Sequence, residues 1–302
     1  MINLGKAVII GMKTSVQYGF AKINLHLDIT GRRDDGFHTV KTVMQGLTLC
    51  DKVTLTQRDD DIVTVDCNVS GVPLDDSNLV VRAVREYCKV TGRKIGADIV
   101  IEKNIPMAAG LAGGSADAAA TLKALRQLDD VGMPIARFYG IASELGSDVP
   151  FCIAGGTALG EGKGDLLRPV SSMPECTIVV ACGTEGVSTP AAYAMLDKKY
   201  RSFAAGEYEP RSTVALKRAL DDGDIYGVAA NMYNIFEEPI SSVRPEVRRI
   251  KEDMLSGGAI GAMMSGSGPS VFGIFVDETL ADKVCDALRA RGVFACVCKP
   301  HN

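Results

Sequence analysis

A run of small residues at 106–119, PMAAGLAGGSADAA, constrains the fold of this chain more than any other segment. It follows an alternating strand pattern at 97–102 and opens into 115–128, whose alanine and leucine content is typical of a packed helix. Glycine allows positive φ and close backbone approach, and the free N–H groups of a helix N-terminus attract anions. The segment predicts a phosphate-binding loop, and a plain helix N-cap at Ser115 is the alternative.

Two common phosphate-binding motifs do not match this sequence. Lys163 lies between two glycines but lacks the upstream glycine and the following Ser or Thr of a Walker A loop. The Gly266-Ser267-Gly268 segment continues with Pro269 and does not match the G-x-G-x-x-G fingerprint. Any nucleotide site built on 106–119 therefore belongs to a different class.

The composition limits the kinds of partner. With 302 residues the chain is long enough for two domains, and its 46% apolar and 23% charged residues are typical of a globular protein. A net charge of −4 provides no general field for nucleic acid, and no apolar run is long enough to span a membrane. Nine scattered cysteines indicate free thiols in a reducing compartment, so we expect a cytoplasmic protein. Cys296 and Cys298 are better explained as alternate strand positions than as metal ligands.

The first half of the chain alternates strands and helices. Residues 16–28 and 52–65 have strand patterns, the second broken at 58–61, and Ser77 is a candidate cap for a helix to about residue 90. A shorter helix ends at Gly146, and the apolar segment 149–159 is interpreted as a buried strand.

The second half begins after 168–174, where two prolines flank a serine pair. A strand at 177–182 is followed by helical sequence to about residue 255. The remaining elements are a strand ending at Met264, a turn at 265–270, a strand at 271–276, a helix from Thr279 and a strand at 293–298. This ending predicts a split βαβ sandwich.

Two further segments carry polar or small residues in core-like surroundings. Lys22, Asn24 and His26 have the spacing of two that places side chains on one strand face, which is either a solvated face or a ligand site. Near the other end, MSGSGPS at 264–270 lies between two apolar strands and, by itself, is best explained as a hairpin turn.

Taken together and in this order, the three segments resemble the three motifs of the GHMP kinases. Four stretches carry the resemblance: AKINLHLDITGRRDDGFHTV, IPMAAGLAGGSADAA, LGSDVPFCIAGGTALGEGKGD and MSGSGPSVFGIF. They are most similar to the members that phosphorylate 4-diphosphocytidyl-2-C-methyl-D-erythritol in non-mevalonate isoprenoid synthesis. The resemblance runs from about Tyr18 to residue 302 and is thinner at 190–259.

The resemblance implies a two-domain α+β fold with the active site in the cleft between the domains. Residues 13–168 would form the N-terminal ATP-binding domain, similar to the second domain of ribosomal protein S5. Residues 175–302 would form a ferredoxin-like split βαβ domain. The implied reaction moves phosphate from ATP, with Mg²⁺, to the 2-hydroxyl of the cytidine diphosphate-linked methylerythritol, and we expect a monomer or homodimer.

The resemblance also assigns roles residue by residue. Asp148 would be the base and Lys22 its partner at the acceptor hydroxyl, and Ser115 is the candidate Mg²⁺ ligand. The implied ATP-binding residues are Lys103, Pro106, Met107, Ala108, Ala109, Gly110, Leu111, Ala112, Gly113, Gly114, Ser115 and Ala116. The implied substrate-binding residues are Asn24, His26, Phe37, His38, Tyr193, Gly266, Ser267 and Gly268.

The sequence departs from the family pattern at a few positions. Ala109 and Ala112 replace common glycines, Phe37 replaces tyrosine and Ser147 replaces alanine. An alanine at positive φ would strain the loop and weaken nucleotide binding. Other GHMP kinases acting on mevalonate, homoserine or a sugar, and a non-catalytic nucleotide-binding relative, remain alternatives, and the absence of a basic stripe disfavours a nucleic-acid-binding module.

Overall fold

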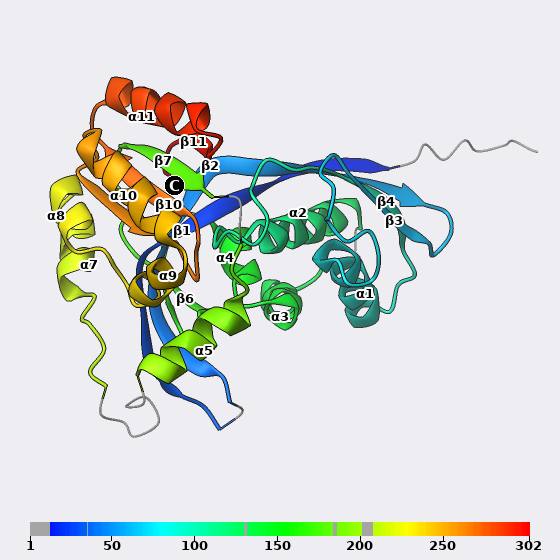
Figure 1. Ribbon diagram of the computed structural model, residues 1–302. Helices are drawn as coiled ribbons and strands as arrows, with labels where there is room; N and C mark the ends of the chain where they lie inside the picture. The colour runs from blue at the N-terminus through cyan, green and yellow to red at the C-terminus, as the bar shows by residue number, and fades with distance from the viewer. Residues whose placement is uncertain (1–12, 35, 130–131, 184–185, 201–207) are drawn as a thin grey trace, which may run out of the picture.

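The computed structural model describes residues 13–34, 36–129, 132–183, 186–200 and 208–302 (Figure 1). Residue 35, in the turn expected after the first strand, lies outside these ranges. Two sheets form the framework, each with helices packed against it, as an α+β fold requires. None of the described helices is both long and apolar enough to cross a membrane.

The larger sheet has seven strands. Its main path runs β3-β4-β2-β1-β8, and β5 joins it by pairing with β2 and with β6. Two long antiparallel strands form its centre and carry the first polar motif. The strands are β1 (Thr14–Arg32), β2 (His38–Arg58), β3 (Val63–Cys67), β4 (Gly96–Glu102), β5 (Thr157–Glu161), β6 (Leu166–Pro169) and β8 (Tyr233–Asn234).

Helices from the first half cover this sheet (Figure 1). They are α1 (Leu79–Thr91), α2 (Gly113–Leu128), α3 (Ile135–Leu145) and the short α4 (Val149–Ala154). The alanine-rich α2 lies against β1 so closely that a Cβ at Gly19 would be 2.4 Å from the carbonyl oxygen of Ala116. Small residues on both elements therefore fix where the N-terminus of α2 lies.

The smaller sheet is antiparallel, in the order β11-β7-β10-β9. Its strands are β7 (Thr177–Cys182), β9 (Gly261–Met264), β10 (Val271–Phe275) and β11 (Phe294–Cys298). Because β10, α11 and β11 form a βαβ unit with β7 between its strands, the predicted split βαβ arrangement is confirmed. The helices of this half are α5 (Thr189–Lys199), α7 (Val214–Asp221), α8 (Ile225–Ala230), α9 (Glu237–Val243), α10 (Pro245–Ser256) and α11 (Glu278–Ala290).

One predicted strand and one predicted cap are wrong. Residues 149–159 form helix α4 followed by strand β5, with Pro150 in the first helical turn and a glycine at positive φ ending the helix. A continuous apolar run has no period that separates a buried helix from a buried strand. Asn78, not Ser77, caps α1 by accepting from the Val80 N–H. The Ser77 hydroxyl donates instead to Asp75.

The second half of the chain returns to the larger sheet at two places. Strand β8 pairs in parallel with β1, and residues 299–301 bond to β2 around Leu47. These contacts attach the second half of the chain to the central strands β1 and β2 of the first. The domain boundary at 168–175 stays a prediction.

Candidate active site

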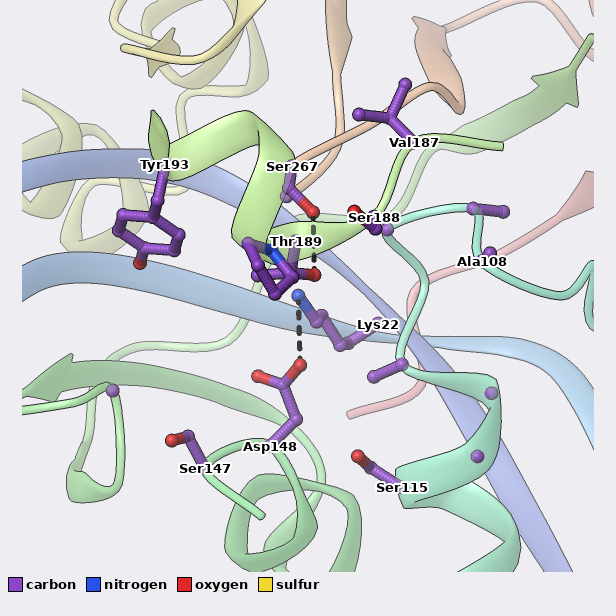
Figure 2. A pocket seen from close by; sticks show the side chains of 18 of the residues that line it. Lys22, Ala108, Ser115, Ser147, Asp148, Val187, Ser188, Thr189, Tyr193 and Ser267 are labelled. Carbon is purple, nitrogen blue, oxygen red and sulfur yellow. Dashed lines mark hydrogen bonds and ion pairs between the residues drawn. The ribbon is translucent and has the colours of Figure 1, made fainter. Parts of the chain in front are cut away.

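The predicted phosphate-binding loop at 106–112 (below, the phosphate loop), the polar row on β1 and the turn after β9 meet at one cleft of about 910 Å³ (Figure 2). Eighteen of the predicted site residues line it: Lys22, Asn24, Phe37, His38, Lys103, Pro106, Met107, Ala108, Ala109, Gly110, Ala112, Gly113, Gly114, Ser115, Asp148, Tyr193, Gly266 and Ser267. Four others do not: His26, Leu111, Ala116 and Gly268.

The loop reaches the N-terminus of α2 through left-handed backbone positions. Gly110 has φ 78°, and two alanines, Ala108 and Ala112, take φ 50° and φ 60°. The expected strain therefore falls on Ala112 but not on Ala109, and Ala108 adds a second strained site, each costing about 1–2 kcal/mol. Ala112 occupies the N-cap position of α2 without a side-chain cap, and the first-turn residues Gly114 and Ser115 line the cleft.

Hydrogen bonds from both halves of the chain hold this loop. The Lys22 N–H donates to the Leu111 carbonyl at 3.1 Å, and the Ser270 N–H donates to the Ala109 carbonyl at 3.1 Å. The Ser265 hydroxyl donates to the Gly110 carbonyl, also at 3.1 Å. Leu111 is thus a buried anchor of the loop and not part of its open surface.

The helix residue Ala116 and the turn residue Gly268 also lie behind the cleft wall. Ala116 is fully buried against β1, while Gly268 takes φ 76° and donates its N–H to the Ser265 carbonyl. Both residues shape the backbone that presents their neighbours to the cleft.

Lys22 and Asp148 lie together on the floor of the cleft (Figure 2). The Lys22 Nζ is 3.6 Å from Asp148 Oδ2, and it donates to Asn24 Oδ1 at 2.8 Å. The Asn24 amide donates in turn to the Thr42 hydroxyl at 2.7 Å. The Lys22 side chain is 6% exposed and that of Asp148 is 37% exposed, so a fixed ammonium supports a carboxylate that solvent and ligands can reach.

His26 does not share the face of Lys22 and Asn24. Across β2, Asn24 is paired with Met44 but His26 is paired with Val43, because the register shifts by one residue between them. Such a bulge turns the following side chain to the other face of the sheet. His26 is buried near Tyr233, and burial lowers its pKa to about 4, with a smaller effect from nearby cationic side chains. The prediction that His26 lies on the cleft face with the other two is wrong.

Aromatic rings gather at the far end of the cleft. The His38 ring stacks on Tyr193 with a centroid distance of 4.9 Å, and His38 Nε2 lies 2.7 Å from Asp197 Oδ1. Phe37 is 62% exposed, with the Lys163 Nζ 5.9 Å from its ring centre. Burial raises the Tyr193 pKa to about 12, so its phenol stays neutral. This end offers flat apolar faces together with a histidine edge.

Sequence reasoning missed several cleft residues. The Thr189 and Ser267 hydroxyls lie 3.1 Å apart in a hydrogen bond at the cleft, and Asn78, the N-cap of α1, also lines it. Lys163 also lines the cleft, although its local sequence matches no nucleotide-binding motif. Asp197 is one turn beyond Tyr193 on α5, a helical spacing that could have indicated its contact with His38.

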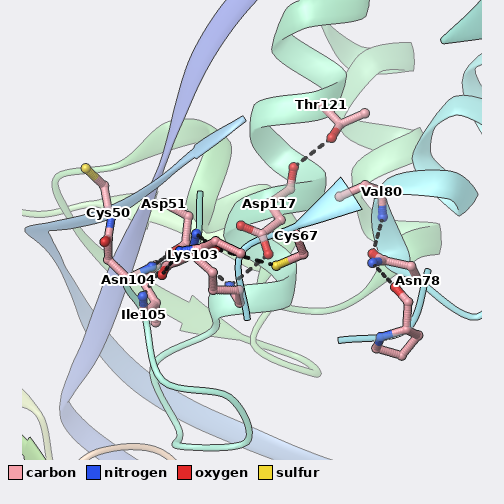
Figure 3. Close-up of polar contacts among 12 residues, drawn as sticks. Cys50, Asp51, Cys67, Asn78, Val80, Lys103, Asn104, Ile105, Asp117 and Thr121 are labelled. Carbon is pink, nitrogen blue, oxygen red and sulfur yellow. Dashed lines mark hydrogen bonds and ion pairs between the residues drawn. The ribbon is translucent and has the colours of Figure 1, made fainter. Parts of the chain in front are cut away.

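Lys103 lines the cleft but is not a free cation. Its side chain is buried, and its Nζ lies between the carboxylates of Asp51 and Asp117 (Figure 3). The expectation that it adds charge directly at the phosphates does not account for these partners. Among the described residues no cluster of three His, Cys, Asp or Glu side chains is arranged for a metal ion, and all nine cysteines are free.

A glycine-rich loop before α2, a split βαβ half and a Lys–Asp pair in the same cleft as that loop are the features expected of the GHMP class of small-molecule kinases. The family descriptions "GHMP kinases N terminal domain" and "GHMP kinases C terminal" match residues 78–156 and 215–293. The chain belongs to the GHMP kinase family. The predicted family and fold are therefore confirmed.

Relatives with high sequence identity carry the name of one enzyme. The chain is 42% identical to 4-diphosphocytidyl-2-C-methyl-D-erythritol kinase of Gloeobacter violaceus, over 96% of each chain. It is 40% identical to the enzyme of that name from Listeria monocytogenes, over 89% of this chain and 90% of the relative. A crystal structure of 4-(cytidine 5'-diphospho)-2C-methyl-D-erythritol kinase matches with TM-score 0.78 and 29% identity, covering 95% of this chain and 100% of the other. The mevalonate kinase of L. major, 15% identical with TM-score 0.75 over 97% of this chain and 98% of the other, shares the fold.

Proposed function

We propose that this protein transfers the γ-phosphoryl group of ATP to the 2-hydroxyl of 4-diphosphocytidyl-2-C-methyl-D-erythritol, producing ADP and the 2-phosphate. The observation that carries the proposal is the placement of Lys22 and Asp148, 3.6 Å apart, in the same cleft as the phosphate loop. The relatives of that name support the choice of acceptor.

The triphosphate binds at the N-terminus of α2. There the open N–H groups of Gly114 and Ser115 and the helix dipole favour negative charge. The apolar side chains of Leu79 and Met107 line the cleft beside this point and suit the adenine ring. ATP thus has its charged end at the helix and its apolar end against α1.

Lys22 and Asp148 prepare the acceptor. The Asp148 carboxylate removes the proton of the acceptor hydroxyl. The hydroxyl oxygen then bonds to the γ-phosphorus as the bond between the γ-phosphorus and ADP breaks. The Lys22 ammonium, held in place by Asn24, stabilises negative charge on the attacking oxygen and on the phosphoryl group. Because the pair is fixed before substrate binds, little reorganisation is needed during transfer.

The aromatic end of the cleft holds the cytidine group. Phe37 presents an exposed ring for stacking on the pyrimidine, and Tyr193 with His38 forms the facing wall. Asp197, by its contact with His38 Nε2, fixes the orientation of the imidazole that reads the base edge. The turn at Gly266 and Ser267 closes the cleft from the second half.

Mg²⁺ fits this site as a companion of ATP. The described residues offer no carboxylate cluster for the ion, and Mg²⁺ commonly takes substrate phosphates and water as its ligands. Ser115 would add one hydroxyl beside the phosphates. When bound, the ion neutralises charge on the β- and γ-phosphates.

An ADP-release assay with ATP and Mg²⁺ tests the proposed acceptor. The panel contains the diphosphocytidyl methylerythritol, mevalonate, homoserine and galactose at equal concentrations. We expect the cytidine-linked alcohol to exceed the others in kcat/KM by a factor on the order of 10² or more, because only it uses the aromatic end of the cleft. Equal or faster turnover of another alcohol would contradict the proposal.

A further inference from the structure

Three charged side chains, Asp51, Lys103 and Asp117, form a buried cluster beside the phosphate loop (Figure 3). Asp51 on β2 is fully buried, and Lys103 and Asp117 are 8% and 4% exposed. The Lys103 Nζ donates to Asp117 Oδ2 at 2.8 Å and also to Asp51 Oδ2. One ammonium thus joins a strand of the large sheet to the second turn of α2.

The same cluster holds the beginning of the loop. Asp51 Oδ1 accepts the N–H groups of Asn104 at 2.5 Å and Ile105 at 2.8 Å, the two residues immediately before Pro106. The cluster therefore fixes both ends of the loop, one through Asp51 and the other through Asp117. The path of residues 106–112 depends on the distance between these two ends.

Lys103 also lies against the first residue of α2. A Cβ at Gly113 would be 3.1 Å from the Lys103 Nζ, so the ammonium is packed beneath the helix N-terminus. The ammonium therefore lies between Asp51, Asp117 and the backbone of Gly113. Two of the three N–H donors of the Lys103 ammonium are thus bonded to carboxylates, although Lys103 and Asp117 both line the cleft.

Burying these three charged groups costs free energy that an apolar cluster would not. Two carboxylates share one ammonium away from water, and Asp117 Oδ1 has no hydrogen-bond partner among the described residues. Burial raises the Asp117 pKa to about 7, Asp51 adds to the rise and Lys103 opposes it. For Lys103, burial acts to lower the pKa, but the two carboxylates outweigh it and the net shift is upward. An apolar trio would pack here at lower cost.

We propose that Asp51, Lys103 and Asp117 are positioning residues for the nucleotide, which lock the two ends of the phosphate loop so that its N–H groups face the triphosphate. This inference deepens the proposed function and rests on nucleotide binding at α2. It replaces direct contact between Lys103 and the phosphates with an indirect role.

Asp117→Leu separates the two roles. If Lys103 touches phosphate, removing a neighbouring carboxylate frees the ammonium, and a polyanion should bind equally well or more tightly. If the cluster positions the loop, the same change should weaken binding of a non-hydrolysable ATP analogue by about tenfold or more, equivalent to about 1.4 kcal/mol. Titration calorimetry without acceptor measures this, so the result does not depend on which alcohol is phosphorylated.

Three further variants complete the test. Asp117→Asn keeps an oxygen that can accept from Lys103 and should restore most of the affinity. The charge-balanced pair Lys103→Met with Asp117→Leu keeps the net charge of the cluster and should still bind the analogue about tenfold more weakly. Lys123→Met is the matched control, because Lys123 is a half-buried lysine on the same helix, bonded to the Cys152 carbonyl and absent from the cleft wall.

The kinetic signature is a raised KM for ATP with the KM for the acceptor changed less than about twofold. Unchanged or tighter analogue binding by Asp117→Leu would overturn the proposal. So would an effect in the charge-balanced pair no larger than that of Lys123→Met.

Discussion

Gly110 is the residue whose replacement should most clearly separate the phosphate loop from the turn that covers it. It has φ 78°, and an added Cβ would lie 2.2 Å from the carbonyl oxygen of Ser265. Positive φ costs an alanine about 1–2 kcal/mol, and the forced backbone shift costs about 1–3 kcal/mol more. Gly110→Ala should therefore lower the free energy of unfolding by about 2–5 kcal/mol.

Urea denaturation followed by circular dichroism measures this change, and analogue binding by calorimetry measures its effect on the loop. Gly114→Ala is the control for stability, because its Cβ would meet only the Leu79 side chain at 3.6 Å. Alanine also favours the helix there, so Gly114→Ala should be neutral or stabilising by up to about 1 kcal/mol. A loss below about 1 kcal/mol for Gly110→Ala, or native analogue affinity, would refute the close packing of loop and turn.

Two other predictions concern His26 and Phe37. Burial lowers the folded-state pKa of His26 to about 4, whereas an unfolded histidine titrates near about 6.5. The free energy of unfolding should therefore be highest above pH 6.5 and should fall by about 3 kcal/mol as the pH drops to 4. Denaturation over this range should show a flatter profile for His26→Gln, and an unchanged profile would contradict the assignment. Phe37→Leu removes a stacking face worth about 1–3 kcal/mol and should raise the acceptor KM about 5- to 150-fold. The KM for ATP is its internal control, and a parallel rise in both would argue against a base-stacking role.

The motifs were predictable from the sequence because backbone chemistry fixes their residue types. A strand followed by a glycine-rich segment and an alanine-rich helix defines the phosphate loop, and α2 begins at Gly113, two residues before the predicted start. Period-two patterns likewise located β7, β10 and β11. The pairing of Lys22 with Asp148 followed from family resemblance, since 126 positions separate them and no local pattern encodes their contact.

What the sequence could not show depends on tertiary packing. The bulge that turns His26 away from the cleft follows from the pairing of β1 with β2, which no period along one strand reveals. Lys103 had the charge expected of a phosphate ligand, but its partners Asp51 and Asp117 are distant in sequence or on the next element. The helix α4 was mistaken for a strand because its side chains are apolar without alternation.

Removing the Asp148 carboxylate is the sharpest test of the proposed phosphoryl transfer. Asp148 occupies the N-cap position of α4, but its side chain makes no capping hydrogen bond to that helix. Asp148→Ala should therefore leave the fold and the binding of the ATP analogue largely intact. Single-turnover transfer from ATP to the cytidine-linked alcohol should slow by a factor on the order of 10² or more. Transfer at the native rate, with both substrates saturating, would contradict the account.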